Sequence, residues 1–206
     1  MKPFADPQLD RPTPLTIDGD VVYGHVADWA GQHIGARGVR PPRSRSGYRY
    51  FHLGAYLNGK AEIDVGKITM DTIHEHDLYA SAEKAKQHYD NTGSVAAYIR
   101  CGEDEHGIWF SGRLAKRLDD GQIEALRGAS VSGDWRPING NAELIGVLAC
   151  CIPGYPIPRP RALVAAGAPP LALVACGIVR PDYADETRLK LRARVARNRL
   201  AARVNR

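Results

Sequence analysis

Short runs of β-branched and aromatic residues, each closed by turn residues, constrain this chain more than any other feature of its sequence. Three such runs occur early: DVVYGHVADW at 20–29, YRYFHLGAYL at 48–57 and EIDVGKITM at 62–70. Alternation of apolar and polar residues over a few positions is typical of strands that bury one face. We therefore expect at least three strands before residue 73.

The middle of the chain predicts a helix followed by a β-hairpin. SAEKAKQHYD favours a helix over about 82–90, with Ser81 as its N-cap. The runs SVAAYIRC at 94–101 and IWFSGRL at 108–114 are joined by the turn sequence GEDEHG. Two strands linked by so short a turn predict an antiparallel hairpin.

A second short helix and a core strand complete the expected fold. DDGQIEALRG at 119–128 begins with acidic residues and ends on Gly128, which are helix start and stop signals. AELIGVLACC at 142–151 is too apolar for a surface strand, so we place it in the core. These elements predict an α+β fold with a mainly antiparallel, barrel-like sheet and a few flanking helices.

Three regions differ in composition. With 206 residues, 44% of them hydrophobic, the chain suits one domain with extensions. Residues 1–18 are proline-rich and predict an extended or loosely tethered arm. Residues 19–180 form the expected domain. In 181–206 apolar residues recur every three or four positions between basic residues, which predicts a basic amphipathic C-terminal helix.

The positive charge of the chain is concentrated at its C-terminal end. Residues 186–206 contain eight Lys/Arg and one acid, whereas 1–185 contain 20 basic and 22 acidic residues. The basic tail is therefore only a weak indication of nucleic-acid binding.

The four cysteines lack CxxC spacing, and no leader peptide or membrane-length apolar run is evident. We expect a reduced, cytosolic protein with no membrane segment.

One polar segment, GASVSGDWRP at 128–137, has the composition of a nucleophile site. A serine becomes a nucleophile when a base takes its proton and when donors stabilise the oxyanion. Gly133 after Ser132 is a plausible oxyanion donor, and Trp135 a plausible wall against water. A Ser/Gly/Asp turn after a helix would look the same. The residues alone leave both interpretations open.

The base for such a serine would come from the histidines. His74 and His76 follow the strand at 62–70 on one face, and His88 lies on the expected helix. His25, His33, His52 and His106 have no serine or acid at suggestive spacing, so we treat them as structural. A zinc hydrolase using His74, His76 and His88 with Glu75 or Asp77 is an alternative class, but no further ligand cluster supports it.

Six blocks in order carry a resemblance to a known family. They are VYGHVADWAGQHIG, GKITMDTIHEHD, HYDNTG, GEDEHGIWFSGRL, SGDWRPINGNAELIGVLACCIPGYPIPR and RALVAAG, which together span about residues 20–180. In this order they resemble the capsid maturation proteases of tailed actinobacteriophages, a branch of the prohead proteases related to herpesvirus assemblins. The resemblance implies a serine endopeptidase with a mixed, mainly antiparallel β architecture.

The resemblance also implies site residues. The nucleophile falls on Ser132, with Ser130 as the alternative because the family usually has serine, any residue, glycine and an aromatic, whereas here Gly133 follows Ser132 directly. The base is His76, or alternatively His88. The third member is Glu143 or Asp134. The residues Gly133, Asp134, Trp135 and Arg136 would line the oxyanion and substrate site, although Arg136 could instead pair with a core acid.

A protease of this kind would cleave phage major capsid protein and scaffold segments, and itself in some cases, inside the assembling prohead in the host cytoplasm. It would use no cofactor or metal, and it could form a homo-oligomer. The alternative is a non-catalytic capsid assembly protein that docks through its basic C-terminal helix.

Overall fold

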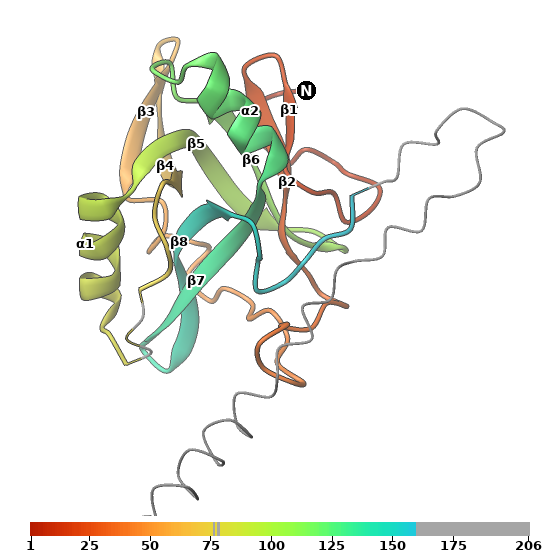
Figure 1. Ribbon diagram of the computed structural model, residues 1–206, viewed down its shortest axis with the longest axis vertical. Coiled ribbons are helices and arrows are strands. Elements are labelled where there is room, and N and C mark those ends of the chain that lie inside the picture. Colours follow the sequence, from red (N-terminus) through yellow and green to blue (C-terminus); the bar gives the residue numbers. More distant parts are fainter. Residues whose placement is uncertain (76, 78, 160–206) are drawn as a thin grey trace, which may run out of the picture. The chain divides into compact units, whose positions relative to one another are not determined.

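The computed structural model describes residues 1–75, 77 and 79–159, and these contain eight strands and two helices (Figure 1). In chain order the elements are β1 (Thr16–Asp18), β2 (Val21–Asp28), β3 (Gly54–Asn58), β4 (Ala61–Met70), α1 (Ala82–Thr92), β5 (Ser94–Glu103), β6 (Gly107–Leu114), α2 (Asp120–Gly128), β7 (Ser130–Ile138) and β8 (Asn141–Cys150). The expected 181–206 helix and residues 160–180 lie outside the described residues.

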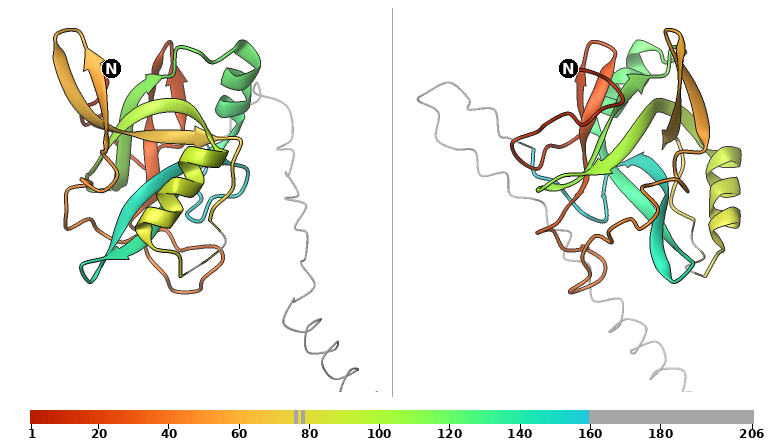
Figure 2. Two further views of the ribbon diagram at one scale, coloured as in Figure 1. Left: turned by 90° about the vertical axis from the view of Figure 1, so that its left-hand side faces the viewer. Right: turned by 180° about the vertical axis from the view of Figure 1, so that it is seen from behind.

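The strands form one strongly curled, mainly antiparallel sheet in the order β1-β2-β6-β5-β4-β8-β7, with β3 paired to β4 (Figures 1 and 2). The parallel contact is between β4 and β8, where Ile68 pairs with Val147 and Thr69 with Leu148. The sheet thus confirms the expected mixed α+β architecture, and its curl gives a half-barrel in which β1 and β7 are the end strands. It also places β7 at one end of the strand order, attached through β8.

Both helices begin at the caps that the sequence indicates. The Ser81 hydroxyl accepts a hydrogen bond from the Lys84 amide at the start of α1. Asp119 and Gln122 form a reciprocal capping box at the start of α2. α1 lies against β7 and β8, so its buried Tyr89 points toward the strand that carries the serine segment.

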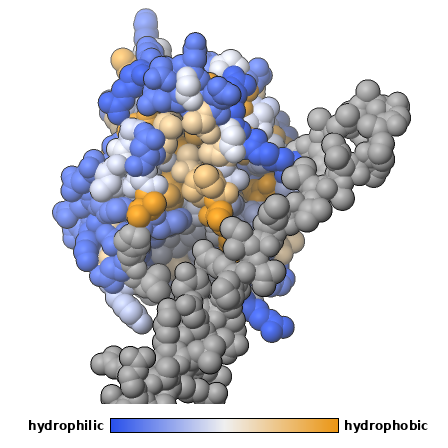
Figure 3. Space-filling model, in the orientation of Figure 1, coloured by the Kyte–Doolittle hydropathy of each residue, from blue (hydrophilic) through white to orange (hydrophobic). Residues whose placement is uncertain are grey.

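The apolar faces of the strands meet in one main core. Its largest fully buried side chains come from four strands and α2: Phe110, Ile68, Ile99, Ile108, Leu126 and Leu144. Leu148 belongs to a smaller cluster with Ala85, Tyr89 and Ile145 of α1 and β8. Figure 3 shows hydrophilic residues over most of the described surface on one side, with apolar residues gathered near the middle of that face. The expected hairpin at 94–114 and the core strand at 142–151 both contribute to this core, as predicted.

Two expectations about local structure were incomplete. The strand expected at 48–57 begins only at Gly54, because residues 48–51 form turns in which Tyr48 has a φ of 66°. The N-terminal arm is extended but held against the sheet. Its Thr13 carbonyl accepts from the His25 amide at 2.7 Å, and Phe4 is buried. The arm ends at Thr16, where β1 begins.

No helix in the described ranges is both long enough and apolar enough to span a bilayer.

Candidate active site

The serine segment is a strand and not a turn. β7 pairs with β8 over its whole length, with Ser132 opposite Leu148 and Asp134 opposite Gly146. Side chains two residues apart share a face of a strand, so Ser132, Asp134 and Arg136 project to the same side. The turn interpretation is therefore wrong for this segment, and three polar residues of one motif converge on one face.

The imidazole that meets this face belongs to His74. Its Nε2 lies 3.0 Å from the Ser132 Oγ, across the gap between β7 and the segment joining β4 to α1. In the part of the chain described here, this contact falls on Ser132 rather than on Ser130. Burial lowers the pKa of His74 below its usual value, and the nearby Arg136 lowers it further, whereas Asp134 opposes the shift. A neutral ring is the form that can accept the serine proton.

A tyrosine and a carboxylate continue the chain of polar contacts. The Tyr89 hydroxyl lies 3.4 Å from His74 Nδ1 and donates a hydrogen bond to the Asp134 carboxylate. Burial and the Asp134 hydrogen bond raise the pKa of Tyr89, so its hydroxyl stays protonated. With that proton directed at Asp134, the tyrosine oxygen can accept from a protonated His74 Nδ1. Nε2 is then free to accept from Ser132.

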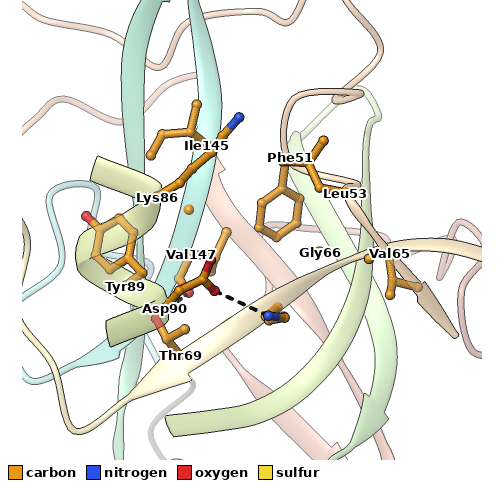
Figure 4. A pocket seen from close by; sticks show the side chains of 13 residues that line it. Phe51, Leu53, Val65, Gly66, Thr69, Lys86, Tyr89, Asp90, Ile145 and Val147 are labelled. Atoms are coloured by element: carbon orange, nitrogen blue, oxygen red, sulfur yellow. Dashed lines mark hydrogen bonds and ion pairs between the residues drawn. The ribbon is translucent and has the colours of Figure 1, made fainter. Parts of the chain in front are cut away.

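Tyr89 reaches Asp134 because a glycine leaves room for its ring. A Cβ added to Gly146 would lie 2.9 Å from the ring of Tyr89, and Gly146 pairs with Asp134 across the β7–β8 ladder. The ring and Gly146 both line a cavity of about 210 Å³ to which α1, β4 and β8 contribute (Figure 4). The tyrosine is therefore positioned by packing as well as by hydrogen bonding.

Arg136 joins the strand to the segment that carries His74. Its guanidinium contacts both Asp134 carboxylate oxygens, at 2.7 Å and 3.0 Å. It also donates to the backbone carbonyl of Asp77 at 2.8 Å and to that of Glu75 at 3.4 Å. Asp134 and Arg136 are both buried. Of the two interpretations of Arg136, the structure shows pairing with a core acid, and this pair braces the histidine segment.

Of the two histidines expected as the base, His88 makes other contacts. His88 Nε2 lies 2.8 Å from the Ile73 carbonyl, and its Nδ1 is 3.9 Å from a Glu75 oxygen. His88 therefore fastens the segment just before His74 to α1 and does not contact Ser132. His76 lies outside the described residues.

Glu143 is not brought to the serine. Although it pairs with Arg136 in the strand register, its carboxylate accepts hydrogen bonds from the hydroxyls of Ser44 and Ser46, each at 2.7 Å. It also accepts from the Arg45 amide at 3.1 Å and from the Asn141 side chain at 2.8 Å. These bonds lower the pKa of Glu143 against the effect of burial. The residue anchors the loop before β3, and Asp134 is the carboxylate near the imidazole.

Gly133 and Trp135 lie on the other side of β7 from the polar residues, and they depend on each other. A Cβ at Gly133 would lie 2.4 Å from the Trp135 ring, so the missing side chain makes room for the indole. The indole packs edge-on against Tyr155 with ring centroids 5.6 Å apart. Gly133 is also paired with Val147 in the ladder and is not in a turn. Its lack of a side chain therefore serves packing.

Ser132 opens onto a cavity of about 440 Å³. The cavity is lined by residues 33–35, 74–75, 132–136 and 152–154. Ser132 is only 3% exposed, so a ligand would reach its hydroxyl through the cavity. The Gly154 amide donates to the Ser132 Oγ at 3.1 Å, and the Ile34 amide donates to the Gly154 carbonyl at 2.9 Å. Gly154 thus places a backbone N–H directly at the serine.

Sequence reasoning missed His74 as the serine's partner, and it missed Tyr89 and Gly154 altogether. The signal for His74 was present, because two histidines two residues apart share a face and either can reach the same target. Tyr89 follows His88 on the helix, and its tertiary contacts with β7 and β8 could not be predicted from the sequence.

Within the described ranges, no group of three or more His, Cys, Asp or Glu side chains is placed to hold a metal ion.

Comparisons with protein-family models, curated proteins and solved structures found no significant match to this chain.

Proposed function

We propose that this chain is a serine endopeptidase in which Ser132 is the nucleophile and His74 the general base. The observation that carries the proposal is the 3.0 Å contact between Ser132 Oγ and His74 Nε2, with Tyr89 and Asp134 behind the ring. A nucleophile, a base and a group that orients the base are the parts of a hydroxyl-based acyl-transfer site.

The reaction follows from these positions. His74 Nε2 takes the Ser132 proton while the serine oxygen forms a bond to the carbonyl carbon of the peptide. The imidazolium then gives that proton to the departing amine nitrogen as the C–N bond breaks. Water, deprotonated by the same Nε2, attacks the resulting ester, and the Ser132 oxygen recovers its proton as the acid product leaves. No redox partner or cofactor is required for these steps.

The buried acid and the tyrosine stabilise the charged ring. When His74 carries two protons, its Nδ1–H points toward the Tyr89 oxygen, and the Asp134 charge lies one hydrogen bond further away. The Asp134 charge favours imidazolium, whereas burial and Arg136 disfavour it. This balance suits a base that must gain and release a proton in one cycle.

Gly154 is the donor best placed for the oxyanion. Its N–H points at the Ser132 Oγ in the resting structure, and a carbonyl attacked by that oxygen would bring its own oxygen within the same neighbourhood. Arg136 is engaged by Asp134 and two carbonyls, so its role in the proposal is to hold the His74 segment in place.

Capsid maturation is the biological setting that the sequence resemblance favours. Five of the six ordered blocks lie between residues 22 and 159, within the described part of the chain, and Ser132 lies in the block where the resemblance places the nucleophile. The mixed α+β sheet is compatible with the architecture that the resemblance implies. We infer phage capsid protein and scaffold segments as substrates, cleaved inside the assembling prohead.

The test is co-expression of the full chain with the phage major capsid protein and scaffold, read as the masses of the capsid chains. Ser132→Ala and His74→Ala are each expected to reduce cleavage more than about 1000-fold, because each removes a group required for acyl transfer. Ser130→Ala is the matched control, two residues away on the same strand, and should cleave normally.

The outcome separates the alternatives. Uncleaved capsid chains with the wild type, or normal cleavage by folded Ser132→Ala protein, would overturn the proposal. Loss of cleavage in Ser130→Ala with retention in Ser132→Ala would move the nucleophile to the other register. Far-ultraviolet circular dichroism of each variant shows that the sheet is intact.

A further inference from the structure

Two isoleucines stand exposed at the cavity that contains Ser132. Ile34 is 56% exposed and Ile152 is 70% exposed, and both line this cavity. They come from chain segments far apart in sequence. The two segments are joined by the hydrogen bond from the Ile34 amide to the Gly154 carbonyl, 2.9 Å long. Pro153 and Trp135 add further apolar surface to the same cavity.

The charged groups of the cavity are already satisfied by partners within the protein. Asp134 is neutralised by Arg136, whose remaining donors reach backbone carbonyls. The Glu75 carboxylate accepts from the Asp77 amide at 3.1 Å and lies 3.9 Å from His88.

The imidazoles of the cavity are engaged as well. His33 Nδ1 accepts from the Gly35 amide at 3.0 Å, and His74 lies between Ser132 and Tyr89. Among the described residues that line the cavity, an acidic ligand side chain would lose water without meeting an unpaired cation, and a basic one would meet only Glu75, whose carboxylate already accepts from the Asp77 amide.

We propose that Ile34 and Ile152 form a subsite for an apolar substrate side chain beside the scissile peptide bond, an inference that rests on the proposed endopeptidase activity. The occupant is a leucine-, valine-, methionine- or phenylalanine-like side chain, and Asp, Glu, Lys and Arg are disfavoured. Covering two exposed isoleucines removes apolar surface from water, which favours such a side chain over a charged one.

The size of the cavity agrees with this occupant. At about 440 Å³ it is in the range of sites that enclose a small ligand, so it holds one large side chain together with the adjoining peptide backbone. A side chain seated between the two isoleucines keeps its own carbonyl close to Ser132, because all three residues line the one cavity.

The test uses the purified full-length chain and a peptide library prepared from an unrelated proteome, with cleavage sites read by mass spectrometry. The wild type should favour apolar over charged residues by about 10-fold or more at a position flanking the cut. Ile34→Asp and Ile152→Asp should each reduce cleavage at apolar sites by about 10- to 100-fold and raise the share of Lys and Arg there.

Leu57→Asp is the matched control, since Leu57 is 71% exposed on β3 and does not line this cavity. It should keep the wild-type preference. A fluorophosphonate that labels reactive serines reports separately on the Ser132 nucleophile, and both isoleucine variants should still be labelled at Ser132.

These readouts distinguish the two failures. Wild-type protein that is neither labelled at Ser132 nor able to cut the library overturns the proposed function and the subsite with it. Labelled, active protein without an apolar preference overturns the subsite alone. The subsite is also overturned if Ile34→Asp and Ile152→Asp leave the apolar preference unchanged. Binding of uncleaved library peptides to Ser132→Ala protein gives a second measure of the same preference.

Discussion

The buried ion pair between Asp134 and Arg136 gives the sharpest prediction about stability. Arg136→Met removes both contacts to the Asp134 carboxylate and both donors to the segment carrying His74. Asp134 is 6% exposed, so its charge would remain buried with Tyr89 as its described hydrogen-bond partner. Breaking a buried pair in this way costs about 3–5 kcal/mol of unfolding free energy. That is a large part of the 5–15 kcal/mol typical of a domain.

A double-mutant cycle isolates the pairing energy. Asp134→Asn keeps an oxygen that can accept from Tyr89 but removes the charge. The Asp134→Asn/Arg136→Met protein should therefore lose about 2 kcal/mol less than the sum of the two single losses. The four unfolding free energies are measured by urea denaturation at pH 7 and at constant ionic strength. A coupling energy below about 0.5 kcal/mol would show that the pair does not stabilise the fold in the way argued.

The same cycle tests how Arg136 affects the site. Because its guanidinium holds the backbone at Glu75 and Asp77, the Arg136→Met protein should react with a serine-directed fluorophosphonate more slowly than the wild type, even where it remains folded. Equal rates of labelling at Ser132 in folded wild-type and variant protein would remove the positioning role while leaving the stability argument untouched.

Three further predictions concern the same site. Tyr89→Phe should lower the acylation rate about 5- to 10-fold, because one hydrogen bond that orients His74 is lost. An unchanged rate would show that Tyr89 does not orient His74. When kcat/KM is measured against pH, its fall on the acid side should have a midpoint below pH 6.5, because burial lowers the pKa of His74 and the proposed reaction needs the neutral ring. A midpoint above pH 6.5 would contradict this. Gly133→Ala should lower the free energy of unfolding by about 1–3 kcal/mol, because the new methyl group forces the Trp135 ring to move. Measured by urea denaturation in a Trp135→Leu background, the same change should lower it much less.

Local signals in the sequence predicted the elements that depend on local structure. Ser81 and the acidic start at Asp119 mark helices that begin within a residue of the expected positions, because capping is a contact with the next turn. The hairpin of β5 and β6 follows from alternation and a short turn. These features need no knowledge of distant partners.

The serine strand was not predictable in the same way. Ser, Gly, Asp and Pro have low strand propensity, so residues 130–138 favour a turn when considered alone. Pairing with β8 along the whole segment overrides that preference. The same limit applies to Glu143, since no pattern within a strand reveals that Ser44 and Ser46, almost a hundred positions earlier, will satisfy its carboxylate.

The sequence indicated the residue types of the candidate site, a serine and a histidine, but not which side chains contact each other. Ser132 was singled out from its segment, and a histidine following β4 was expected to approach it. The choice among His74, His76 and His88 depends on how the backbone turns after Met70, and alternation along a strand no longer applies once the strand has ended. Asp134 was considered as an acid near the imidazole, but its link through Tyr89 requires the packing of α1 on the sheet.

The short parallel contact between β4 and β8 has a consequence for how the site is assembled. Two residue pairs join β4 and β8 in the ladder. The Thr69 hydroxyl adds a hydrogen bond to the Val147 carbonyl, 3.3 Å long. Ser132 belongs to the hairpin on one side of this junction, and His74 follows the strand on the other side. The distance between the Ser132 hydroxyl and the His74 imidazole therefore depends on the alignment of β4 with β8, as well as on the contacts of Arg136 and His88 with the His74 segment. In the proposed mechanism, Thr69→Ala would therefore slow proton transfer from Ser132 to His74, although Thr69 does not line the cavity that contains Ser132.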